Sequence, residues 1–151
     1  MSKYTDDYVL KLIYESNTLK NIYDKSSDSL KLLFTSLIKE TLPFSDNQRD
    51  KRCCGLYAKE MEETSFRLAK EYSGKGRKIQ NYCMYTLRPS NEYIIVDLRT
   101  DGIHIESSIL NLANIGDYYN GGREWHRFIV RNFKDLNEAV KLISKVYHAY
   151  A

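Results

Sequence analysis

Four side chains around one predicted turn could bind a metal ion or transfer protons: Asp97, Arg99, His104 and Glu106. Asp101-Gly102 lies between two alternating runs of β-branched residues, which is the strongest short-range signal of a two-residue β-hairpin loop. That register pairs Asp97 with Glu106 on one face of the hairpin. The opposite face then holds Ile94, Val96, Leu98, Ile103 and Ile105.

Asp97 and Glu106 would repel each other in this register. Two carboxylates beside a third polar group can bind a divalent metal for phosphodiester cleavage, so a metal-dependent nuclease is one hypothesis. The Asp…Glu-x-Lys arrangement of restriction-type nucleases is missing, because Ser107 and Ser108 follow Glu106. We therefore favour surface ion pairs with Arg99 and His104, which add little stability, and we predict no metal or cofactor.

A second candidate site is the segment from Tyr118 to Phe128, which combines aromatic rings, arginines and a Gly121-Gly122 turn. Flat rings beside cations are what base stacking and phosphate contact require. The predicted ligand-binding residues are Tyr118, Tyr119, Arg123, Trp125, His126 and Arg127. In a strand from Glu124, however, Trp125 and Arg127 share one face while His126 and Phe128 share the other. A hairpin turn with buried Trp125 and Phe128 is thus the alternative.

The basic residues concentrate in residues 49–78, which hold nine Lys/Arg against five Asp/Glu in a chain of net charge +3. Such a cluster can attract phosphate. It can equally be a solvated helix face balanced by its own glutamates, and we favour this second interpretation.

The elements that must position these residues are helical in the first half of the chain. Leu30, Leu33, Phe34, Leu37 and Ile38 follow the spacing of an amphipathic helix. Ser26, Ser27 or Asp28 can cap this helix and Pro43 ends it. Tyr8 to Tyr23 predicts an earlier helix broken near Ser16-Asn17. A further helix is predicted from about Gly55 to Tyr72.

The period changes to that of strands after Gly76. We predict a meander of about four antiparallel strands over 79–87, 92–99, 103–109 and 124–130, with a loop over about 110–122. A helix over 135–150 follows, in which Asp135 takes the capping role opposite Glu138. The predicted fold class is α+β, one domain over 1–151: 1–75 mostly helical, 76–131 an antiparallel sheet, and helices packed on one face.

The bulk composition is that of an ordinary globular protein, with 42% apolar and 28% charged residues. No apolar run reaches the roughly 18 to 20 residues of a membrane helix, and the first residues lack the pattern of a signal peptide. The three cysteines form no zinc or redox motif. We expect a cytoplasmic protein that does not contact membranes.

The stretch from Tyr82 to Tyr150 contains Ile-Ile-Val-Asp-Leu, Ile115-Gly116, Trp-His-Arg-Phe and an ending from Asp135-Leu136 through Ile143 to Tyr147. These motifs resemble a bacterial family labelled "predicted transport protein", which also occurs as a tail domain of restriction-system and other nuclease-like proteins. The resemblance covers less than half of the chain. It implies an α+β accessory module linked to phage or prokaryotic defence, and it transfers no catalytic residue.

From these observations we expect a non-catalytic binding module for an anionic partner, either nucleic acid or a nucleotide-like ligand. Two alternatives stay open: the metal-dependent phosphodiesterase on Asp97 and Glu106, and a protein–protein inhibitor or oligomerisation domain with a protein target. In the second alternative the exposed aromatic and arginine side chains would form the interface. We also expect a homodimer.

Overall fold

The structure is a computed structural model that describes residues 4–46, 65–72, 79–119 and 121–149. In these residues, three helices precede a five-stranded antiparallel sheet and one helix follows it. The helices are α1 (Asp6–Tyr14), α2 (Asn17–Asp24), α3 (Asp28–Thr41) and α4 (Phe133–Ala149), with short 3-10 turns η1 (Leu42–Phe44) and η4 (Pro89–Asn91). The strands are β1 (Ser65–Glu71), β2 (Ile79–Arg88), β3 (Tyr93–Arg99), β4 (Ala113–Gly116) and β5 (Trp125–Val130). The predicted α+β class is confirmed.

The N-terminal helices begin where the sequence predicts. The Ser16 side chain accepts a hydrogen bond from the Leu19 N–H and separates α1 from α2. Ser27 caps α3 in the same way through the Leu30 N–H. Each bond satisfies an N–H group that the first helical turn leaves without a backbone partner. None of the helices in the described ranges is long and apolar enough to cross a bilayer.

The start of α4 differs from the prediction. The helix begins at Phe133, and the Asn132 side chain accepts a hydrogen bond from the Asp135 N–H at 2.9 Å. Asp135 instead accepts one from the Arg131 N–H. Glu138 accepts from the Ser107 hydroxyl at 2.7 Å and so ties the 107–110 segment to α4. Asn132 therefore takes the capping role predicted for Asp135.

A strand replaces part of the predicted helix over 55–72. Residues 65–71 form β1, which pairs with β2, whereas 55–64 lie outside the described residues. Phe66 and Leu68 alternate with half-buried Ser65 and Arg67, which is the period of a strand rather than that of a helix. Pairing with β2 decides between the two because it buries both apolar side chains completely.

The predicted hairpin forms its turn but not its second strand. The Ile103 N–H donates to the Thr100 carbonyl at 2.9 Å, and Asp101 and Gly102 both have positive φ. Residues 103–109 nevertheless form no strand, and β5 lies beside β3 instead. The register pairing Asp97 with Glu106 is therefore wrong. Asp101 explains the outcome, because its carboxylate accepts the backbone N–H groups of Arg123 and Glu124 and so holds the start of β5 against the turn.

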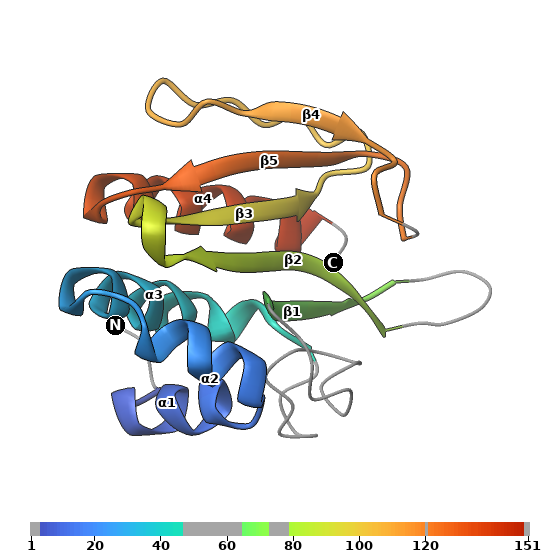
Figure 1. The fold of residues 1–151 in the computed structure, drawn as a ribbon. Helices are drawn as coiled ribbons and strands as arrows, with labels where there is room; N and C mark the ends of the chain where they lie inside the picture. Colours follow the sequence, from blue (N-terminus) through green and yellow to red (C-terminus); the bar gives the residue numbers. More distant parts are fainter. Residues whose placement is uncertain (1–3, 47–64, 73–78, 120, 150–151) are drawn as a thin grey trace.

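The strand order β1-β2-β3-β5-β4 creates two different faces. One face carries Ile94, Val96 and Leu98 of β3 and is fully buried against the helices, as the sequence predicts. Ile105 also joins this core although it lies outside any strand. Figure 1 shows α4 behind the strands, with the other face of the sheet toward the viewer. No helix in the described ranges covers that second face, which we call the open face.

Candidate functional site

The open face carries a concentration of arginines. Residues paired across antiparallel strands share a face, so Arg67 lies beside Met84, Arg88 beside Tyr93, and Arg127 beside Asp97. We call the following set the arginine face: Arg67, Arg88, Arg99, Arg127 and Arg131. Two carboxylates, Asp97 and Asp101, bond these arginines directly. Among the described residues of this face, the arginines therefore outnumber the carboxylates that bond them.

Asp97 and Arg127 form the centre of this face. The Arg127 Nε donates to Asp97 Oδ1 at 2.7 Å and its Nη2 to Oδ2 at 3.2 Å, while the Tyr119 hydroxyl donates to Oδ2 at 2.7 Å. The Asp97 side chain is 2% exposed and that of Arg127 is 36% exposed. The buried carboxylate thus fixes the orientation of a guanidinium whose outer surface stays in solvent.

The two partners of Asp97 titrate outside their ordinary ranges. Burial, then the hydrogen bond to Asp97, raises the pKa of Tyr119 to about 12. The hydrogen bonds to Asp97 raise the pKa of the Arg127 guanidinium further above its ordinary value, against the opposing effect of burial. Arg127 is consequently a permanent cation, and Tyr119 keeps its proton at every physiological pH.

Trp125 supports the loop over the open face. Its side chain is buried, its Nε1–H donates to the Gly121 carbonyl at 2.6 Å, and its ring centroid lies 4.9 Å from that of Tyr119. This geometry fixes Tyr119 above Asp97. It leaves almost no Trp125 surface for a ligand, so the structure places Trp125 in the supporting role of the alternative interpretation.

Arg123 and His126 lie outside the arginine face. Arg123 is exposed at the turn, where its Nη2 donates to the Asp101 carbonyl. His126 pairs with Leu98 and so points to the other face, where its Nδ1 lies 2.9 Å from the Thr100 hydroxyl. Thr100 also donates to Glu124 at 2.6 Å, and this bond and one from the Gly102 N–H lower the pKa of Glu124. These contacts join the ends of β3 and β5.

The predicted acid cluster is not assembled. Asp97 lies beneath Tyr119 and Arg127, whereas Glu106 is exposed and meets His104 at 3.4 Å. Arg99 donates to Asp101 at 2.7 Å. Throughout the part of the chain that the structure describes, no group of three or more His, Cys, Asp or Glu side chains could hold a metal ion.

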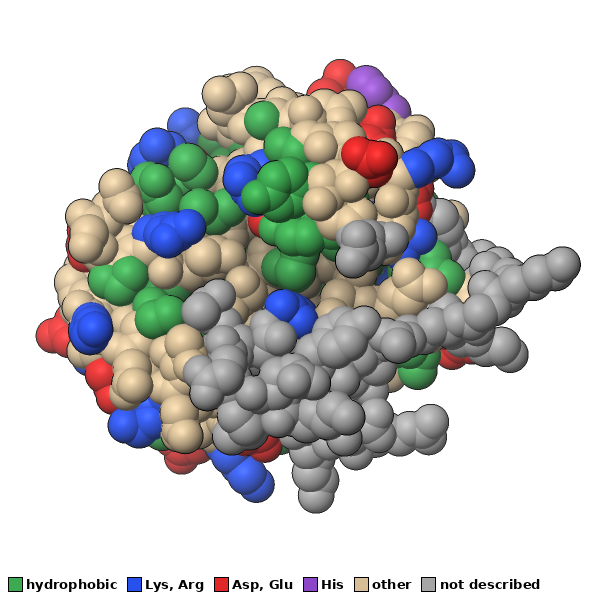
Figure 2. Space-filling view, turned by 45° about the vertical axis from the view of Figure 1, so that its right-hand side comes forward, with side chains coloured by type: hydrophobic (Ala, Val, Ile, Leu, Met, Phe, Trp, Pro, Cys, Tyr) green, Lys and Arg blue, Asp and Glu red, His purple; other side chains and the backbone are tan. Residues whose placement is uncertain are grey.

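Two arginine–tyrosine pairs lie on the open face, and a third pair, Arg99 with Tyr72, is largely buried, because Tyr72 belongs to the core and the Arg99 side chain is 11% exposed. The guanidinium carbon is 5.4 Å from the ring centroid for Arg131 and Tyr93 and 5.2 Å for Arg127 and Tyr118. It is 4.0 Å for Arg99 and Tyr72. Tyr118 is 64% exposed, which leaves most of its ring available for stacking. Figure 2 shows Lys and Arg side chains set among hydrophobic ones over this side of the molecule.

Sequence reasoning missed Arg88, Tyr93 and Arg131 because each sits at a strand end that reads as a turn. Arg88 lies two positions after Thr86 and four after Met84, and Tyr93 lies two positions before Ile95 and four before Asp97. Side chains at such even spacings share one face of a strand, and this is the signal that locates Arg88 and Tyr93.

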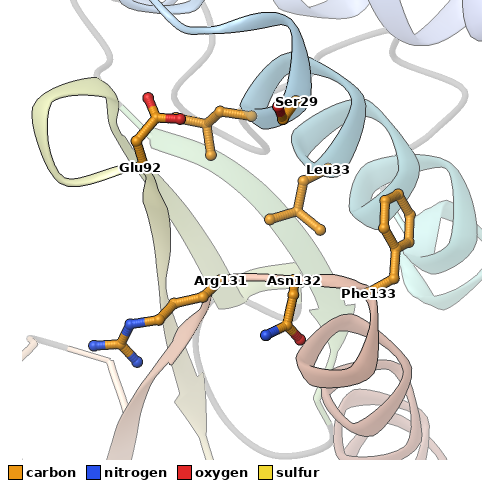
Figure 3. A pocket seen from close by; sticks show the side chains of 7 residues that line it. Ser29, Leu33, Glu92, Arg131, Asn132 and Phe133 are labelled. Atoms are coloured by element: carbon orange, nitrogen blue, oxygen red, sulfur yellow. The ribbon is translucent and has the colours of Figure 1, made fainter.

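A hollow of about 290 Å³ lies beyond this end of the sheet, between α3 and the start of α4. In Figure 3 the Phe133 ring points toward α3 beside Leu33, whereas the Arg131 guanidinium points away from both helices. Arg131 lines the hollow, but the direction of its guanidinium and its contact with Tyr93 place the charged group on the open face.

Only two basic residues of the predicted 49–78 segment lie in described ranges, Arg67 and Lys70. Lys70 is 4% exposed and donates to the Tyr147 carbonyl, so it joins β1 to α4 instead of facing a partner. The other basic residues of that segment lie outside the described residues. Comparison with protein-family models, curated proteins and solved structures found no match.

Proposed function

We propose that this protein is a non-catalytic module that binds single-stranded nucleic acid across the arginine face. The observation that carries the proposal is the presence of two arginine–tyrosine pairs, Arg127 with Tyr118 and Arg131 with Tyr93, on a sheet face that no described helix covers. Arginine offers a planar fork for phosphate oxygens. An exposed tyrosine ring beside it offers a stacking surface for an unpaired base.

Arg127 and Tyr118 are the best-prepared of these pairs. Asp97 and Tyr119 hold the Arg127 guanidinium in place before any ligand arrives, which lowers the entropy lost on binding. Tyr118 stands over this guanidinium and is the most exposed large aromatic side chain of the described residues. Ile95 and Ile129 pair beside them and add apolar surface to the platform.

The test is a salt series on binding to a fluorescent oligothymidine of about 12 nucleotides. For single strands, the logarithm of the binding constant falls with the logarithm of salt by roughly 0.7 per phosphate neutralised. Arg131→Gln should weaken binding and reduce this slope by about 0.7. Lys141→Gln, on the exposed side of α4, is the matched control and should change neither value.

Tyr118→Ala tests the stacking contribution separately. It should weaken binding by about 1–3 kcal/mol and leave the salt slope unchanged. Binding that does not respond to salt would contradict the proposal. So would equal losses for Arg131→Gln and Lys141→Gln, because the arginine face would then have no special role.

A further inference from the structure

One residue of β5, Ile129, has a free backbone edge. The pairing of β4 with β5 ends where Ala113 lies opposite Arg127. Two positions beyond Ile129, the Arg131 N–H donates to the Asp135 carboxylate at 2.9 Å. Strands rise about 3.3 Å per residue, so these two occupied positions of β5 and its end lie only about 13 Å apart. The free stretch between them is too short for an added strand, but it is wide enough for one flat ring system.

The hydrogen-bond alternation shows that the Ile129 N–H and C=O both point to this edge. The Thr100 N–H donates to the Glu124 carbonyl at 2.9 Å, so the hydrogen-bonded pairs of β3 and β5 fall at Glu124 and at every second residue after it. Phe128 is one of these residues and Ile129 is not. One donor and one acceptor of Ile129 therefore face outward, and the described residues supply no backbone partner for them.

A hollow of about 330 Å³ adjoins this edge, a volume at the lower end of small-molecule sites. Buried Leu110 and Phe128 give it apolar walls. Arg127 and Arg131 line it as well, and their guanidinium groups contact tyrosine rings of the open face. The hollow is thus continuous with the arginine face.

Three hydrogen-bonding groups follow one another along this edge. The Ile129 N–H comes first and the Ile129 C=O second. The third is the Asp135 carboxylate, whose Oδ2 is held by the Arg131 N–H and whose Oδ1 has no partner among the described residues. Asn111 also lines the hollow, but its amide both donates and accepts and so favours neither kind of ligand group. The edge therefore calls for a ligand that presents an acceptor, a donor and a second donor in that order.

We propose that this hollow receives one guanine of the single strand bound across the arginine face. The proposal rests on the proposed function and adds base selection to it. Guanine presents the acceptor O6, the donor N1–H and the donor N2–H₂ along one edge, which would meet the Ile129 N–H, the Ile129 C=O and Asp135 in turn. The phosphates on either side of this guanine would lie on the open face beside Arg127 and Arg131.

The other bases do not present this order of groups. Thymine and uracil have a keto oxygen, an N–H and a second keto oxygen, so the second oxygen would face the Asp135 carboxylate. Adenine and cytosine have a ring nitrogen without hydrogen at the position of the guanine N1–H, which leaves the Ile129 C=O without a donor in the same pose. These bases would contact only the open face.

The test compares three strands of about 12 nucleotides: oligothymidine, and the same strand with one central guanosine or one central inosine. Inosine differs from guanosine only in lacking the amino group, and all three strands carry the same charge. The guanosine strand should bind about tenfold more tightly than the inosine strand, because the amino group donates to a carboxylate. The salt dependence should be the same for all three, since the number of phosphate contacts does not change.

Asp135→Asn should reduce the preference for guanosine over inosine to less than about threefold, because a neutral amide oxygen replaces the carboxylate. The amide oxygen can still accept the Arg131 N–H, and oligothymidine binding should persist. Glu106→Gln is the matched control, because it removes one negative charge from an exposed side chain that does not line the hollow. It should leave the preference at about tenfold.

Hydrogen exchange of backbone amides, followed by nuclear magnetic resonance, gives a readout that needs no variant. The guanosine strand should slow exchange of the Ile129 amide about tenfold, whereas oligothymidine should leave it unchanged. Oligothymidine binding with equal affinities for guanosine and inosine strands would overturn the base selection and leave the proposed function intact. Failure of all three strands to bind would refute the proposed function itself. A guanosine preference that persists in Asp135→Asn without protection of Ile129 would place the guanine elsewhere and overturn the inference.

Discussion

Asp97 shows how one buried carboxylate organises the candidate site. It lies at the centre of the open face, yet its side chain is 2% exposed because Arg127 and Tyr119 cover it. A buried charge is tolerated only when its hydrogen-bonding capacity is met. Three hydrogen bonds meet it here, and the same bonds fix the two side chains that a ligand would approach.

Asp97→Asn should destabilise the protein by about 2–3 kcal/mol, because it removes the charge that compensates Arg127 and leaves amide N–H groups facing donors. The cost stays below that of a fully buried ion pair since Arg127 can turn toward solvent. Tyr119→Phe, which removes one hydrogen bond, should cost about 1 kcal/mol. Urea unfolding measures both. An Asp97→Asn protein as stable as the parent would show that the network contributes nothing to folding.

Tyr119 should make stability fall at alkaline pH. Its pKa is raised to about 12 in the folded protein from an ordinary value of 10.0. Its contribution to stability is therefore fully present below about pH 10 and is lost as the pH rises toward 12.

Tyr147 also has a pKa raised to about 12, by burial and by its bond to Asp46, so the parent protein loses stability through both groups. The urea midpoint of Tyr119→Phe should fall less steeply above pH 10 than that of the parent. Identical slopes would contradict this assignment.

At the scale of elements, the 117–123 loop depends on glycine where it returns to β5. Gly122 has φ +81°, and a Cβ there would overlap the Arg99 side chain and approach Asp101 Oδ1 to 2.9 Å. Gly116 has φ +62°, with open space around the position of a Cβ. Both glycines therefore have a left-handed backbone, but only Gly122 has side-chain atoms close to the position that a Cβ would take.

Gly116→Ala should lower the free energy of unfolding by about 1 kcal/mol, which corresponds to the backbone strain alone. Gly122→Ala should cost about 3 kcal/mol, because it must also displace Arg99 from Asp101. Thermal unfolding of both variants separates strain from crowding. Equal losses would mean that Arg99 moves aside freely and is not held by its bond to Asp101.

At the scale of the whole molecule, all described helices that pack on the sheet cover the same face. This one-sided arrangement leaves the open face as a broad surface on which arginines and tyrosines from four strands and one loop meet. A tyrosine ring stacks only on a base that is not already stacked in a duplex.

The protein should therefore prefer single strands. In competition with the labelled oligothymidine, an unlabelled single strand should displace the label at about tenfold lower concentration than a duplex of the same length. Tyr118→Ala should narrow this difference, because it removes stacking and leaves phosphate contacts. Equal displacement by the two competitors with the parent protein would show that the bases are not contacted.

The sequence by itself determined the elements whose signals are local. The apolar spacing of α3, the caps at Ser16 and Ser27, the alternation in β2, β3 and β5, and the Asp101-Gly102 turn each depend on residues within a few positions of one another. The same alternation places Ile94, Val96 and Leu98 in the core. It also indicates that Trp125 and Arg127 share a face, which their contacts with Tyr119 on the open face confirm.

Only the tertiary structure decided which strand lies beside β3, and with it the composition of the site. Residues 103–109 carry a strand-like pattern, but β5 takes the place next to β3 because Asp101 and Thr100 bind the two residues that precede it, which are 20 or more positions away in the chain. That choice replaces Glu106 with Arg127 as the neighbour of Asp97. Periodicity gives the face on which a side chain lies, but the identity of its cross-strand partner depends on long-range pairing. In place of the predicted pair of carboxylates, the arginine face holds an ion pair between buried Asp97 and partly exposed Arg127.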